Sequence, residues 1–234
     1  MARTGRRRRA HKASDGYLTL QRGTTAQVMA FAREGVHHIG SGYDHLLFLV
    51  SLLLPAVLVR RDGAWQPAPT FAGALGDLAK TVTAFTIAHS VTLALAALDL
   101  VRLPDRLVEP AIALSVVLAA LNNLRPVFGG ARWVVAFGFG LVHGFGFAGA
   151  LGELGLPAGA RLVSLAAFNA GVEFGQLAIV IPFVAIAWLV RGSRAYRRFA
   201  LAGGSVAIAA IAAVWFAERA FDLPLVVAAG VTPP

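Results

Sequence analysis

Long blocks of apolar residues, separated by short polar stretches, fill most of this chain between residues 43 and 220. Most of the blocks are long enough for a helix to cross the roughly 30 Å of hydrocarbon in a bilayer. They do not alternate polar and apolar positions as the strands of a membrane barrel do. The pattern therefore predicts an all-α polytopic membrane bundle of about six transmembrane helices. The expected spans are residues 43–59, 78–98, 107–124, 133–154, 162–190 and 199–216.

The segments that flank these blocks have a different character. Residues 1–35 are expected to form a basic tail followed by an amphipathic helix, over residues 17–35, that lies on the membrane surface. Residues 36–220 would be the transmembrane bundle, and residues 221–234 a C-terminal tail whose apolar part is too short to cross alone. Since the loops are short, we expect a single membrane domain.

Composition agrees with a membrane protein and narrows its chemistry. The chain is 57% hydrophobic and only 14% charged, whereas a soluble domain carries roughly 25% charged residues. It has no cysteine, which excludes a disulfide framework and a thiolate metal site. Much of the net charge of +9 comes from the N-terminal tail. Because no aromatic residues interleave that basic run, we expect a solvated end or a contact with anionic lipid, and no nucleic-acid partner.

Charge in the loops predicts an orientation. Lys and Arg are more numerous in the loops between spans one and two, three and four, and five and six than in the other loops. The excess favours a cytoplasmic position for those loops and an outside position for both termini. The basic tail favours the reverse orientation.

Ionisable side chains inside or at the rim of the apolar blocks are the candidate functional residues. Such residues are costly at membrane depth and usually mark a pathway, a relay or a site. A single buried histidine often does no more than bond a neighbouring helix, but four histidines and two carboxylates on several spans indicate a site. Neutral imidazole and carboxylate suit Ni²⁺, Co²⁺, Zn²⁺ or Fe²⁺. The expected metal ligands are His38, Asp44, His45, His89, His143 and Glu173.

Residue spacing suggests how these side chains converge. Asn169, Glu173 and Gln176 fall on one face of a helix, so the two amides are expected to orient the carboxylate. Ser90, beside His89 in a polar patch at mid-depth, is expected to support the metal ligands without binding the ion.

Glycines are expected to shape the same region. Gly140 and Gly144 are four residues apart, a small-residue spacing that favours close helix packing near His143. Gly40 and Gly42 are expected to break the helix after His38. The chain could then fold back and bring His38 over Asp44 and His45, or the glycines could form only a flexible turn.

Taken in order, four motifs resemble the HupE/UreJ family of hydrogenase and urease accessory proteins. They are His38-x5-Asp44-His45 with Leu46-Leu47-Phe48-Leu49, then residues 85–93 (FTIAHSVTL), residues 137–147 (FGFGLVHGFGF) and residues 168–176 (FNAGVEFGQ). The resemblance implies a multi-pass inner-membrane nickel permease or facilitator that supplies metal to hydrogenase or urease, with the six ligands above as its metal-handling residues. The Gly-Phe-Gly context and the distance from His143 to Glu173 in sequence depart from the compact His-x-Glu arrangement of the characterised permeases. In these two features the sequence resembles the branch of the family that often carries an extracytoplasmic N-terminal domain. We expect that domain to be missing here.

Three functions remain open at this level. The first is a divalent metal transporter, in which His38, Asp44 and His45 capture the ion at the outer rim and His89, His143 and Glu173 hold it at mid-membrane. The second is an intramembrane metal-dependent hydrolase, with Glu173 as the base for a metal-activated water. The third is a partner subunit that does not transport. Ligands strung along a path would favour transport, and a closed three-ligand site with one open position would favour the enzyme.

Overall fold

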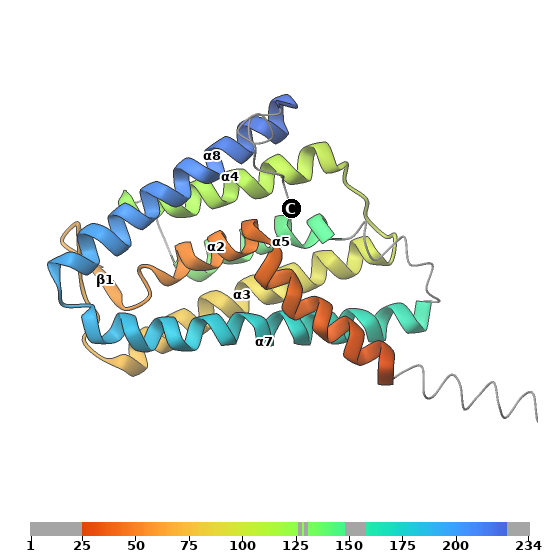
Figure 1. The fold of residues 1–234 in the computed structure, drawn as a ribbon, viewed down its shortest axis with the longest axis horizontal. Helices are drawn as coiled ribbons and strands as arrows, with labels where there is room; N and C mark the ends of the chain where they lie inside the picture. The colour runs from red at the N-terminus through yellow and green to blue at the C-terminus, as the bar shows by residue number, and fades with distance from the viewer. Residues whose placement is uncertain (1–24, 126–127, 129–130, 148–157, 224–234) are drawn as a thin grey trace, which may run out of the picture.

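The computed structural model describes residues 25–125, 128, 131–147 and 158–223, and it is almost entirely helical (Figure 1). The predicted all-α membrane bundle is confirmed. Its first helix covers residues 25–41. The later elements are α2 (Tyr43–Leu53), β1 (Leu58–Arg61), β2 (Ala64–Pro67), α3 (Phe71–Ala97), α4 (Asp105–Leu124), α5 (Arg132–His143), η1 (Gly144–Phe147), α7 (Ala158–Val190), η2 (Tyr196–Gly203) and α8 (Gly204–Phe221).

The expected count of about six spans is wrong for the part of the chain that the structure describes. Four stretches are long and apolar enough to cross a membrane: Phe71–Ala97, Asp105–Leu124, Ala160–Val190 and Tyr196–Phe221. The expected first and fourth spans contain helices of only 11 and 12 residues, α2 and α5. At 1.5 Å per residue these are about 17 Å long, roughly half the thickness of the hydrocarbon. The end of the expected fourth span, from residue 148, lies outside the described residues.

A β-hairpin explains why α2 ends early. The expected first span extended to Val59, but the chain turns after Leu53 and pairs β1 with β2 in antiparallel register. Asp62 and Gly63 form the tight turn, both with positive φ (51° and 75°), as a two-residue hairpin turn requires. The hairpin is docked on the bundle by the Trp65 indole N–H, which donates to the carbonyl of Asn123 at 2.8 Å.

Close packing of α3 against α5 is made possible by glycine. A Cβ on Gly140 would lie 2.5 Å from the carbonyl oxygen of Phe85, and one on Gly144 would collide with Thr92 Oγ1 and the carbonyl oxygen of His89. The two backbones therefore approach closely at the level of His89 and His143. In Figure 1, α7 runs along the other side of α3, and α8 lies along α4.

The helix of residues 25–41 packs on the bundle through a second glycine contact. A Cβ on Gly35 would meet the carbonyl oxygen of Phe168, and one on Gly171 would meet that of Ala32. This helix thus crosses α7 with backbone against backbone, and it continues through the expected boundary between residues 35 and 36 (Figure 1). The basic tail, the first part of the expected amphipathic helix and most of the C-terminal tail fall outside the described residues.

Candidate metal centre

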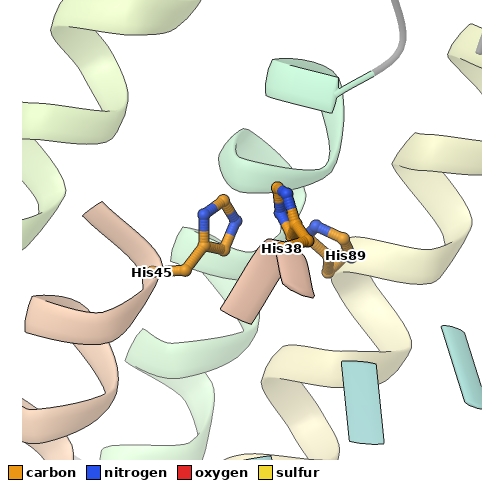
Figure 2. A group of neighbouring side chains, drawn as sticks. All are labelled: His38, His45 and His89. Carbon is orange, nitrogen blue, oxygen red and sulfur yellow. The ribbon is translucent and has the colours of Figure 1, made fainter. Parts of the chain in front are cut away.

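Three histidines from three different helices meet inside the bundle. His38 comes from the helix of residues 25–41, His45 from α2 and His89 from α3 (Figure 2). Each offers one ring nitrogen, and these three nitrogens all lie within 4.8 Å of one another. We call these residues the histidine trio.

The break between the first two helices brings His38 and His45 together. The ring centroids of the two histidines are 4.5 Å apart. Gly42 is the only residue between the helices, and a Cβ there would lie 2.5 Å from the carbonyl oxygen of His38 and 3.5 Å from His45 Nδ1. Gly40, by contrast, is helical and meets nothing within 4 Å. The expected fold-back occurs, but Gly42 alone breaks the helix.

A fourth imidazole, that of His143, lies against His45 but does not belong to the group of nitrogens within 4.8 Å of one another. His143 is the last residue of α5, it is fully buried, and its ring centroid lies 4.9 Å from that of His45. Buried polar atoms normally have a hydrogen-bond partner. Among the described residues, however, Nε2 of His45, Nε2 of His89 and Nδ1 of His143 are buried and have none. Neutral imidazole nitrogens of this kind are suitable ligands for Ni²⁺, Co²⁺ or Zn²⁺.

Sequence analysis missed Ser115, the hydrogen-bond partner of His143. Ser115 lies on α4, is 2% exposed, and has its Oγ 2.7 Å from His143 Nε2. The same hydroxyl donates to the carbonyl of Ile112 at 2.6 Å. A polar residue between Leu114 and Val116 in an apolar block was the available signal, but spacing alone could not pair it with α5.

Asp44 lies next to His45 in sequence, but its carboxylate is engaged elsewhere. Its Oδ2 accepts a hydrogen bond at 2.9 Å from Arg219, near the C-terminal end of α8. Asp44 does not belong to the group of nitrogens that can share an ion, although its Oδ1 is buried and has no partner among the described residues. Arg219 is the second residue that sequence analysis missed.

The structure does not bring Glu173 into the group. Its side chain is exposed on α7, whereas Gln176 is buried and accepts a hydrogen bond from Thr86 Oγ1 at 3.2 Å. The two positions are about 60° apart around a helix, so the expected polar face is divided between the bundle and the outside. Asn169 and Ser90 are both half-buried. Neither amide nor Ser90 is seen to orient Glu173 in the described part of the chain.

The sequence matches the family described as HupE / UreJ protein over residues 14–219. The chain belongs to the HupE/UreJ family. This is a membrane family associated with nickel and cobalt transport. Searches of the curated proteins and of the solved structures give no match.

Helix ends add to the electrostatics of this HupE/UreJ site. The helix of residues 25–41 ends just after His38, and α5 ends at His143. The C-terminal end of a helix carries a partial negative charge from its unpaired carbonyls. The N-terminal end of α2, two residues before His45, carries the opposite partial charge, so helix ends of both signs lie at the trio.

Two small cavities lie along α2 and α3 on one side of the trio. The first, about 10 Å³, is bordered by His45, Phe48, Leu49, Leu52, Val82, Phe85 and Gln176. The second, about 40 Å³, is bordered by Leu52 again and by polar residues that include Asp77, Thr81, Asn122 and Arg132. Leu52 separates the two spaces, and the second lies beside the N-terminal ends of α3 and α5.

Proposed function

We propose that this HupE/UreJ protein is a divalent metal transporter of the inner membrane. Its proposed ion is Ni²⁺, with Co²⁺ as the alternative, and the metal is for hydrogenase or urease maturation. The observation that supports the proposal best is the histidine trio, whose ring nitrogens lie within 4.8 Å of one another between apolar helices. His38, His45 and His89 are the proposed ligands, with His143 beside them.

The chemistry of the donors fits an ion that must be released again. Moving a dehydrated dication into hydrocarbon costs a prohibitive amount of free energy. Each binding site along its route must therefore replace the lost water ligands. Imidazoles do this without contributing negative charge. The carboxylate of Asp44, next to His45 in sequence, adds attraction that its pairing with Arg219 moderates. Such a site holds the ion less tightly than a cage of carboxylates.

The small volume of the cavity at His45 favours transport over hydrolysis. The cavity at His45 is about 10 Å³, which is about the space of one water molecule and too small for a lipid or an amide. Glu173, the expected base of a hydrolase, is exposed and outside the trio. Leu52 borders both this cavity and the larger one near Asp77, so an ion that moved from His45 toward Asp77 would have to pass Leu52. The exposure of Glu173 removes a residue from both models, and three histidines grouped at one point are the arrangement expected of an enzyme. The small space at His45 and the family's association with nickel and cobalt transport favour transport.

The test is metal uptake by the full-length protein in liposomes that contain a metal-sensitive dye, run in parallel for Ni²⁺, Co²⁺ and Zn²⁺. We expect uptake by the wild type, and a loss of roughly 100-fold for His45→Ala, since removal of one ligand opens the trio. His37→Ala is the matched control, because His37 is exposed on the neighbouring helix and contacts Ser41. It should transport as well as the wild type.

Wild-type protein that inserts correctly but moves none of the three ions would contradict the proposal. Equal uptake by His45→Ala and His37→Ala would contradict the assignment of the site. Hydrolysis of a lipid or amide by wild type and not by His45→Ala would support the enzyme instead.

A further inference from the structure

We propose that Ser115 is a positioning residue that fixes the tautomer of His143, so that His143 presents Nδ1 as a fourth ligand beside the histidine trio. The metal part of this inference rests on the proposed function. The tautomer part rests only on the contacts of the protein itself.

The first step follows from counting hydrogen atoms. Ser115 Oγ contacts two groups, the Ile112 carbonyl oxygen at 2.6 Å and His143 Nε2 at 2.7 Å. A hydroxyl carries one hydrogen, and a carbonyl oxygen carries none. The serine hydrogen must therefore go to Ile112, since two oxygens at that distance without a hydrogen would repel each other. Ser115 Oγ then accepts, and Nε2 of His143 carries the proton.

The second step concerns the other nitrogen of the ring. In a neutral imidazole one nitrogen is a donor and the other an acceptor, so a proton on Nε2 leaves the lone pair on Nδ1. Nδ1 of His143 is buried and has no hydrogen-bond partner among the described residues. The ring lies against His45, Phe48 and Phe85, at centroid distances of 4.9, 4.9 and 5.3 Å. Phe48 and Phe85 offer no polar hydrogen, and His45 is itself a proposed ligand, so an ion bound at His45 would satisfy this lone pair.

The third step is the anchoring of the serine. Ser115 is 2% exposed and His143 is fully buried, so water does not compete for the contact. The Ile112 carbonyl belongs to the same turn of α4 as the serine, which holds the hydroxyl in one rotamer. A ligating histidine is commonly oriented in this way by a hydrogen bond from its second nitrogen, and loss of that bond costs roughly 10- to 100-fold in metal affinity.

The tautomer is tested first, in metal-free, full-length protein labelled with ¹⁵N-histidine. The chemical shifts of the two ring nitrogens report which one carries the proton. We expect His143 to be protonated at Nε2 in the wild type and in Ser115→Thr, which keeps the hydroxyl, and to be a mixture in Ser115→Ala. Wild-type His143 protonated at Nδ1, or an unchanged Ser115→Ala spectrum, would overturn the inference.

Cobalt binding is tested next, by titrating the same proteins with Co²⁺ and following its visible d–d absorption. We expect Ser115→Ala to bind roughly 10- to 100-fold more weakly, with a changed absorption band, and Ser115→Thr to resemble the wild type. Ser205→Ala is the control, because Ser205 is also fully buried but accepts a hydrogen bond from Asn123, about two turns further along α4 than Ser115. A Ser115→Ala affinity and band equal to those of the wild type would overturn the role of Ser115 in metal binding. If wild type binds no Co²⁺, Ni²⁺ or Zn²⁺, the proposed function fails, and the metal-free tautomer still decides what Ser115 does to His143.

Discussion

The long helix α3 and the short helices α2 and α5 contribute to the candidate site in different ways. The long helix α3 has 27 residues and carries His89 near its middle, while α2 and α5 have 11 and 12 residues and cannot cross a bilayer alone. Each short helix has a histidine close to one end: His45 is the third residue of α2, and His143 is the last residue of α5. Transporters often build ion sites from interrupted helices whose ends point at the ion. The short helices thus bring helix ends, as well as side chains, to the candidate site.

The largest effect is expected where the short helix α5 touches the long helix α3. In Gly144→Leu the new side chain would collide with Thr92 Oγ1 and the His89 carbonyl oxygen. Overpacking typically costs 1–3 kcal/mol, and here the obstacle is backbone, so we expect most of the folded protein to be lost. Folded yield by fluorescence-detected size exclusion measures this.

Gly138→Leu is the matched control for that variant. Gly138 is on α5, the helix that ends one residue before Gly144, is exposed, and meets nothing within 4 Å. Its folded yield should equal that of the wild type. Equal yields of the Gly138 and Gly144 variants would show that the close contact between α3 and α5 is dispensable.

The next effect concerns the start of the short helix α2. Gly42→Ala places a Cβ 2.5 Å from the His38 carbonyl oxygen, so the end of the preceding helix must move and carry His38 with it. We expect a roughly 10-fold loss of Co²⁺ affinity, measured by titration, because a displaced ligand no longer fits the trio. Gly40→Ala, which meets nothing within 4 Å, should bind as the wild type does. Equal Co²⁺ affinities of Gly42→Ala and Gly40→Ala would show that the helix break at Gly42 does not position His38.

Acid should weaken metal uptake. Imidazole binds a metal only when neutral, so protons compete with the ion at a pH low enough to charge the ring. Burial favours neutral imidazole, so affinity should change little near pH 7 and fall only at acid pH, by at most tenfold per pH unit for each proton that competes. Isothermal titration calorimetry in buffers of different ionisation enthalpy should then count few protons released at pH 7. Release of one proton per histidine at pH 7 would show that the metal-free imidazoles are charged, against the neutral site proposed here.

The smallest effect is expected for Asp44, in the first turn of the short helix α2. Its ion pair with Arg219 is partly exposed, with side chains 21% and 28% accessible, and such pairs contribute about 1 kcal/mol or less. Asp44→Asn should thus lower the melting temperature by a few degrees at most, and weaken Co²⁺ binding a few-fold by removing a nearby negative charge.

A double-mutant cycle with Arg219→Gln separates the two roles of Asp44. If the carboxylate acts only as the partner of the arginine, Asp44→Asn should change Co²⁺ affinity no further once Arg219 is replaced. A persistent loss in that background would show that Asp44 itself attracts the ion. Arg219→Gln alone should then bind Co²⁺ somewhat more tightly than the wild type.

Much of the architecture could be predicted from the apolar blocks. Each expected span contains a helix in the described part of the chain, because an apolar backbone in lipid must satisfy its own hydrogen bonds. The count of spans was wrong because hydropathy does not show where a helix stops. The apolar residues Val57 and Leu58 are fully buried, yet they belong to the turn and the hairpin after α2.

Local composition and motifs are enough to predict the membrane bundle, the family and the histidines worth examining. Which polar groups meet depends on how the helices pack. Ser115 and His143 are 28 residues apart, and Asp44 and Arg219 are 175 apart. Periodicity places a side chain on a face of its helix, but the neighbour of that face depends on helix lengths and crossings. The contacts at Gly35 and Gly144 set those crossings, and the same arrangement brings His38 to the trio and leaves Glu173 outside it.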